Sequence, residues 1–144
     1  MADKEEEWGW TEATMAAYRQ GRAVSAIEQV SVGHKIFIEI GGETVAPGLK
    51  MRIIKALQEC LEMDGADNVC LWIRQYGNSL HFGYYRKDCP WTLRARDFLN
   101  SHSEELKPYH FHWISGLLYC YRPEEIQDYI DKEVKPHRVK TSRA

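Results

Sequence analysis

The stretch "NVCLWIRQYGNSLHFGYYRK", residues 68–87, constrains the fold more than any other part of this sequence. Two runs rich in β-branched and aromatic residues flank Gly77 and Asn78, and a Gly–Asn pair between such runs is typical of a tight turn. We therefore predict an antiparallel β-hairpin whose two-residue loop lies between Tyr76 and Ser79.

This loop length decides which residues face one another across the hairpin. It places Trp72 opposite Gly83, where the missing side chain leaves room for the indole ring. The other predicted pairs are Gln75 with Leu80, Ile73 with Phe82 and Leu71 with Tyr84, which together with Val69 form a mostly apolar face. The opposite face carries Cys70, Trp72, Arg74, Tyr76, His81, Gly83, Tyr85 and Lys87.

The chain before residue 34 contains one predicted helix and one ambiguous segment. Thr11 is a suitable N-cap for a helix that continues to about Gln20, and Gly21 is a typical helix stop. Residues 22–31 are predicted as a strand because that glycine ends the helix, and a continued helix is the alternative.

Residues 34–63 predict a strand, a turn and a long helix. The run "HKIFIEI" (34–40) alternates so that Ile36, Ile38 and Ile40 share one face. A turn at Gly41-Gly42 follows, after which 43–45 pairs back briefly. The helix begins at Pro47 and continues to about Met63, since its apolar residues recur with a period of 3.6.

Three more helices are predicted in the last third. Asp88 caps the first, which presents an apolar stripe of Trp91, Ala95, Phe98 and His102. The second begins at Pro108 and is apolar on nearly every side, so we expect it to be buried. The third begins at Pro123, has an inner stripe of Ile126, Tyr129, Ile130 and Val134, and ends at Pro136.

Together these elements predict an α+β fold in a single domain. We expect an antiparallel sheet of about four strands, packed by four to five helices, with a C-terminal helical hairpin. A chain of 144 residues suits one domain, which we assign to residues 11–134. Residues 1–10 form an acidic tail and residues 135–144 a basic tail.

Charge and hydropathy exclude several classes of protein. The net charge of −2 argues against a general polyanion binder. No segment resembles a signal peptide, and no apolar run approaches the roughly 20 residues that a membrane span needs. The four cysteines show no close pairing, so we expect free thiols and a cytoplasmic location.

The helix pair around residues 108–131 has helix-turn-helix spacing, yet we predict no binding to duplex DNA. The turn of such a motif usually has a glycine, with a left-handed backbone, where this chain has Cys120. The second helix begins with Glu124 and Glu125, which DNA phosphates would repel. A packed helical hairpin is the simpler interpretation.

No constellation of residues predicts catalysis, a metal site or a cofactor. His110 and His112 point about 200° apart on a helix, so they cannot chelate one ion together. Cys89 is the best candidate nucleophile, with His81 or His102 as the base, although Asp88 beside it would raise the thiol pKa. We therefore name no catalytic residue.

The second face of the hairpin is the candidate binding surface. Its proposed members are Phe37, Trp72, Arg74, Tyr76, His81 and Tyr85, with Lys35 on the same side. Aromatic rings interleaved with basic groups suit a protein hot spot, a flat ligand or stacked bases. The alternative is that a second layer of helices covers this face and makes Trp72 a core residue.

These features favour a small cytosolic binding or regulatory module that has no chemistry of its own. A protein is the foremost expected partner, and an inhibitor would have this character. Single-stranded nucleic acid or a flat small ligand comes second, and we expect neither duplex DNA nor a membrane as partner. The alternative from another class is a small cysteine- or metal-dependent enzyme.

Overall fold

The predicted hairpin forms the centre of the molecule. The protein is described by a computed structural model over residues 11–44, 46–106 and 108–134. Strands β2 (Val69–Tyr76) and β3 (Ser79–Arg86) pair antiparallel in the predicted register, with Trp72 opposite Gly83. Gly77 has a φ of 62°, a left-handed conformation that suits the turn.

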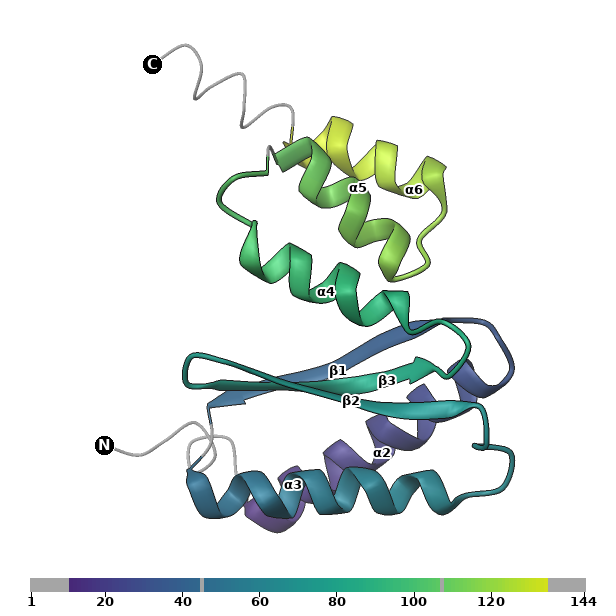
Figure 1. The fold of residues 1–144 in the computed structure, drawn as a ribbon, viewed down its shortest axis with the longest axis vertical. Coiled ribbons are helices and arrows are strands. Elements are labelled where there is room, and N and C mark those ends of the chain that lie inside the picture. The colour runs from purple at the N-terminus through teal and green to yellow at the C-terminus, as the bar shows by residue number, and fades with distance from the viewer. Residues whose placement is uncertain (1–10, 45, 107, 135–144) are drawn as a thin grey trace.

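The sheet has three strands in the described part of the chain, one fewer than predicted. Strand β1 (Phe37–Thr44) pairs antiparallel with β3, so the order is β1-β3-β2 and β3 is central (Figure 1). The predicted turn at Gly41-Gly42 is wrong, because both glycines continue β1 after a register shift. They permit close approach: a Cβ on Gly41 would lie 2.9 Å from the Phe82 ring.

Helix α2 (Glu12–Ser31) is continuous through Gly21, so the predicted helix stop and the strand over 22–31 are wrong. The alternative, a continued helix, is what the structure has. Residues Ala23, Ala26, Ile27 and Val30 share one face and are buried against the sheet. Their burial offsets the cost of about 1 kcal/mol for a glycine inside a helix. The predicted cap is confirmed, since Thr11 Oγ1 accepts from the Thr14 N–H.

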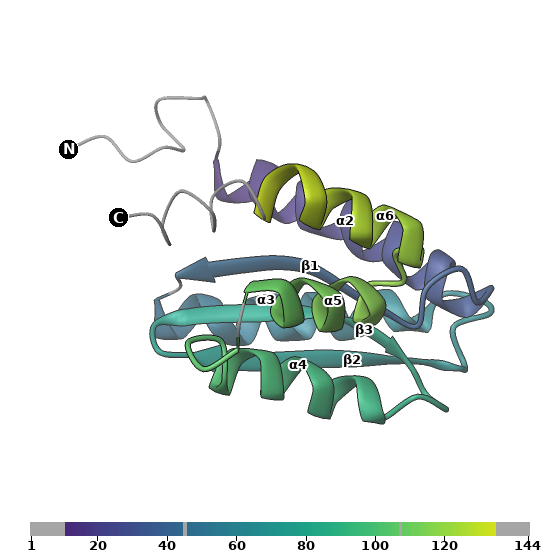
Figure 2. The same ribbon diagram turned by 90° about the horizontal axis from the view of Figure 1, so that it is seen from above.

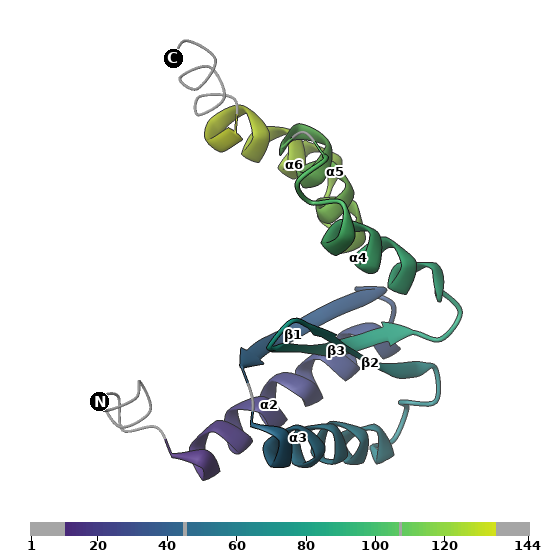
Figure 3. The ribbon, with the colours of Figure 1, turned by 60° about the vertical axis from the view of Figure 1, so that its left-hand side comes forward.

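Helix α3 (Pro47–Glu59), extended by a 3₁₀ turn over Cys60–Glu62, confirms the predicted helix. Helices α2 and α3 cover the same face of the sheet (Figures 1 and 3). The core between these helices and the sheet includes Ile53 and Leu57 of α3 and Leu80 and Phe82 of β3. Tyr84 lies there too, and its hydroxyl donates to the Leu57 carbonyl at 2.7 Å.

Helix α4 (Trp91–Ser101) lies over the opposite face of the sheet, along the β2 side in Figure 2. Asp88 does not cap it: the residue before the helix is Pro90, and the Asp88 carboxylate accepts from Arg86 instead. The predicted apolar stripe is wrong in part, since Ala95 packs against the core but the large residues of the stripe do not. Trp91 and Phe98 are exposed, whereas Thr92 and Leu99 of the same helix are buried.

Helices α5 (Pro108–Leu118) and α6 (Pro123–Tyr129) form the predicted helical hairpin beyond α4, and a π-helical turn continues α6 over Ile130–Val134 (Figure 3). Leu117 is 52% exposed, so α5 is less buried than predicted. Ile126 and Ile130 are buried as predicted, but Tyr129 is half exposed.

The turn between α5 and α6 contains Cys120 with a φ of 63°. The left-handed backbone that such a turn requires is therefore present without glycine. Both predicted tails and Pro136 lie outside the described residues. None of the described helices is long and apolar enough to cross a membrane.

Candidate functional site

The predicted binding face lies beneath α4 and α5. Phe37 and Trp72 are 0% and 1% exposed and form a second core with Leu99 of α4 and Leu118 of α5. The Phe37 and Trp72 rings meet edge to face, with centroids 5.1 Å apart. Of the two alternatives from the sequence, the structure therefore has the covered face. Neither ring can stack on a base or a flat ligand while it is buried in this way.

The other four predicted residues line the margin of this interface and are half-buried. Tyr76 and His81 lie in ring contact, with centroids 5.1 Å apart. Tyr85 packs against the second core. The Arg74 Nε lies 3.1 Å from Asp97 Oδ1 of α4, so a sheet residue is ion-paired to the helix above it.

Glu39 of β1 is the polar centre of the interface, and its side chain is only 17% exposed. One carboxylate oxygen accepts from Arg96 Nε at 3.0 Å and from the Tyr119 hydroxyl at 2.8 Å. The other lies 2.7 Å from His81 Nδ1. One carboxylate thus joins two strands, α4 and the end of α5.

Burial by itself would raise the pKa of Glu39, but the hydrogen bonds from Arg96, His81 and Tyr119 hold that pKa below its usual value. Burial and the nearby Glu39 carboxylate raise the pKa of Tyr119. Burial and the hydrogen bond to Asp97 likewise raise the pKa of Tyr76 to about 12. The cluster is therefore most stable with an ionised carboxylate and neutral phenols.

Arg96 completes the cluster by contacting aromatic rings as well as Glu39. Its guanidinium carbon lies 5.1 Å from the Tyr76 ring centroid and 5.7 Å from that of Trp72. Cation–π contacts of this kind add to the ion pair. Since the carboxylate oxygens and the guanidinium are engaged by protein groups, the arrangement is suited to holding α4 and α5 on the sheet.

The sequence interpretation missed Glu39, Arg96 and Tyr119 as members of this cluster. Glu39 had a detectable signal, because strand alternation puts it on the same face as Phe37. Arg96 had none, since the sequence pattern placed the apolar stripe of α4 on its opposite side. Tyr119 joins through the helical hairpin, a contact made far along the chain from β1.

The structure gives little support for chemistry at the cysteines or for a metal site. All four cysteines are free, as predicted. Burial and the neighbouring Asp88 raise the pKa of Cys89, which opposes formation of a thiolate. Among the described residues, no group of three or more His, Cys, Asp or Glu side chains is arranged to hold a metal ion.

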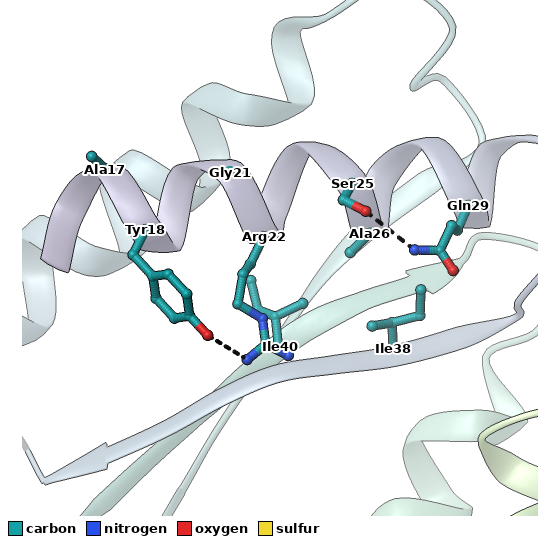
Figure 4. A pocket seen from close by; sticks show the side chains of 9 residues that line it. All are labelled: Ala17, Tyr18, Gly21, Arg22, Ser25, Ala26, Gln29, Ile38 and Ile40. Carbon is teal, nitrogen blue, oxygen red and sulfur yellow. Dashed lines mark hydrogen bonds between the residues drawn. The ribbon is translucent and has the colours of Figure 1, made fainter. Parts of the chain in front are cut away.

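An open groove lies elsewhere, between α2 and strand β1 (Figure 4). Its volume is about 410 Å³, and Ile38 and Ile40 of β1 form one wall. Tyr18 and Arg22 reach across from α2, and the Arg22 guanidinium donates to the Tyr18 hydroxyl at 3.4 Å. The remaining lining residues are small or polar: Ala17, Gly21, Ser25, Ala26 and Gln29.

This groove follows a strand that lies at the edge of the sheet. In the order β1-β3-β2, β1 has a neighbour on one side only within the described residues. Alternate N–H and C=O groups of its outer edge therefore have no strand partner there. The groove therefore places the unpaired backbone edge of β1 beside apolar side chains of the same strand.

No protein-family model, curated protein or solved structure matches this chain.

Proposed function

We propose that this protein is a cytosolic binding module, without chemistry of its own, that captures an extended segment of a partner protein. The segment adds as a fourth strand to the outer edge of β1 and lies in the groove beside α2. The partner is a protein, as the sequence predicts, but it binds at the β1 edge. The sheet face that the sequence favoured is covered by α4 and α5.

The coincidence of groove and open strand edge carries the proposal. An added strand gains main-chain hydrogen bonds from the edge, and alternate side chains of that strand enter the adjoining groove. Here the eight residues of β1 provide the edge, and Ile38 and Ile40 offer apolar contact. A rigid helix lies on the other side, so the groove needs little ordering before it binds.

The α2 wall indicates what the segment carries. Small residues at Ala17, Gly21 and Ser25 recur every fourth position, which leaves room for a bulky side chain. Arg22 is the charged residue of the wall, so an acidic side chain beside the bulky one would be favoured. We expect a segment that alternates apolar and polar residues and contains an acidic group.

The alternative classes find weaker support. The raised pKa of Cys89 disfavours a thiolate enzyme. Burial of Phe37 and Trp72 disfavours base stacking on the sheet. The cytosolic location rests on the four free thiols, which suit a reducing compartment.

The test uses a random-sequence peptide library displayed on phage, selected on the full chain. Gly21→Trp is the blocking variant, because a Cβ at Gly21 meets no other atom within 4 Å and the indole can fill the groove without displacing the core. Glu28→Trp is the matched control, an exposed position of the same helix that does not line the groove. Gly21→Ala should stabilise the protein by about 1 kcal/mol, which shows that the position tolerates a side chain.

Selected peptides should bind the wild type and Glu28→Trp equally and Gly21→Trp at least about tenfold more weakly, a loss of about 1.4 kcal/mol. Methylating the alternate backbone nitrogens that face β1 should abolish binding, whereas methylating the other alternate set should be tolerated, because an added strand donates to β1 through only one of the two sets. Peptides that bind Gly21→Trp normally, or that tolerate N-methyl groups on both alternate sets, would refute the proposal. So would dimers of the free protein paired through β1, since the occupant would then be a second copy.

A further inference from the structure

A second cavity is lined by residues of α5, α6 and the turn between them. These two helices lie at the end of the molecule remote from α2 and β1 (Figure 1). Its volume is about 410 Å³, which is within the range of small-ligand pockets. Gly116 allows the two helices to approach closely here, since a Cβ at this position would lie 2.6 Å from an Ile126 side-chain carbon. The cavity is thus built by the hairpin rather than left by loose packing.

Three aromatic rings and one carboxylate line this cavity. The rings belong to His112 of α5, Tyr121 of the turn and Tyr129 of α6, and the carboxylate belongs to Glu125. The His112 and Tyr129 rings lie 5.1 Å apart and are inclined by 58°, so they form two adjoining walls. Both tyrosines are about half exposed, which leaves ring surface for a ligand.

We propose that this cavity binds an alkylated ammonium group. The faces of aromatic rings attract cations, and several rings around one space are the usual receptor for quaternary ammonium groups. Glu125 places a carboxylate, ion-paired with Arg122, beside the rings. An ammonium group already lies over one of them: Lys35 Nζ is 5.1 Å from the Tyr121 ring centroid.

The charges around the cavity are balanced, so the aromatic rings decide which ligand it prefers. Glu125 is ion-paired with Arg122, at 2.8 Å, and Asp128 with Lys132, at 3.0 Å. Glu124, in the first turn of α6, adds a further negative charge to these pairs. Lys35 is the opposing charge, but its ammonium donates to the Tyr119 carbonyl at 2.9 Å, which holds it at the end of α5. A soft alkylated cation loses less hydration than a bare ammonium, so it suits a site made of aromatic ring faces best.

The test compares choline with 3,3-dimethylbutan-1-ol, which has the same shape without the charge. Titration of the full chain, followed by NMR of the aromatic and histidine resonances, gives both affinities. Choline should shift the signals of His112 and Tyr129 and bind about tenfold more tightly than the neutral alcohol. Equal binding of the two would make the cavity a simple apolar pocket and would overturn the proposal, as would the absence of any shift at tens of millimolar choline.

Two variants assign the binding to this site. Tyr129→Leu keeps an apolar side chain but removes the π face, and it should weaken choline binding at least fivefold. Glu125→Gln changes only an exposed charge and should weaken it two- to threefold, without risk to the fold. Trp91→Leu, at a half-exposed aromatic residue of α4 that lines neither this cavity nor the α2–β1 groove, is the control and should leave the affinity unchanged. Unchanged binding in both cavity variants would contradict the assignment.

A peptide containing trimethyllysine, with its unmethylated counterpart, identifies the source of the group. Tighter binding of the methylated peptide than of choline would indicate a protein side chain as the natural ligand. A methylated peptide that binds no more tightly than choline would indicate a small molecule as the natural ligand.

Discussion

The Glu39 cluster predicts that one carboxylate holds the α4–α5 layer onto the sheet. Replacing Glu39 by alanine removes the acceptor of Arg96, Tyr119 and His81 together. Arg96, whose side chain is 13% exposed, is then left without its carboxylate. Breaking a buried ion pair from one side costs about 3–5 kcal/mol, and because water reaches part of this pair we expect about 3 kcal/mol.

Urea unfolding monitored by circular dichroism measures this loss. For a chain of this size, a loss of about 3 kcal/mol corresponds to a fall in melting temperature of about 6–12 °C. Asp128→Asn is the control, because the Asp128–Lys132 pair is exposed and should contribute less than about 0.5 kcal/mol. In a double-mutant cycle of Glu39→Ala with Arg96→Met, the coupling energy should reach about 2 kcal/mol.

Hydrogen exchange locates the effect. If the carboxylate holds the upper layer, exchange in Glu39→Ala should accelerate most in α4 and α5 and least in α3. A coupling energy below about 0.5 kcal/mol, or exchange that rises equally throughout the chain, would refute the reasoning.

The pH dependence gives an independent check on the same carboxylate. The pKa of Glu39 is lower in the folded protein than in the unfolded chain. Its contribution is therefore fully present above the unfolded pKa of about 4.3 and is lost as the pH falls through the lower folded value. The stability difference between wild type and Glu39→Gln should narrow on acidification, and a constant gap would contradict the assignment.

Three further predictions concern single positions. Gly83→Ala should destabilise the protein by about 3 kcal/mol or more, because the added Cβ would overlap the Ile38 carbonyl and lie 2.8 Å from Glu39 Cα. In the same melting experiment Gly48→Ala should have little effect, because the space around Gly48 is open. Cys120→Gly should stabilise the protein by about 0.5–1 kcal/mol and Cys120→Val should destabilise it, because the left-handed backbone at this position is strained for a residue with a side chain. Equal melting temperatures of the two variants would contradict this strain. Cys89→Ser should leave the melting temperature within about 2 °C of wild type and should not change peptide binding, because its thiol has no role in the proposed function.

The sequence determined those features that depend on neighbouring residues. The Gly77-Asn78 loop and the alternation around it were enough to predict the hairpin register, including Trp72 opposite Gly83, because a two-residue turn leaves one choice of pairing. The helix beginning at Pro47 and the helical hairpin could be predicted for the same local reason.

Tertiary structure decided every feature that depends on which surfaces meet. Gly21 and the Gly41-Gly42 pair predicted a helix stop and a turn, yet burial of α2 against the sheet and the close approach of β1 to Phe82 extend both elements through their glycines. Tertiary contacts likewise bury Trp72 beneath α4 and α5, leave Trp91 and Phe98 of α4 exposed, and leave the groove beside β1 open. Each follows from contacts between segments far apart in the chain, whose free energies exceed the local preferences of about 1 kcal/mol that a sequence pattern reports.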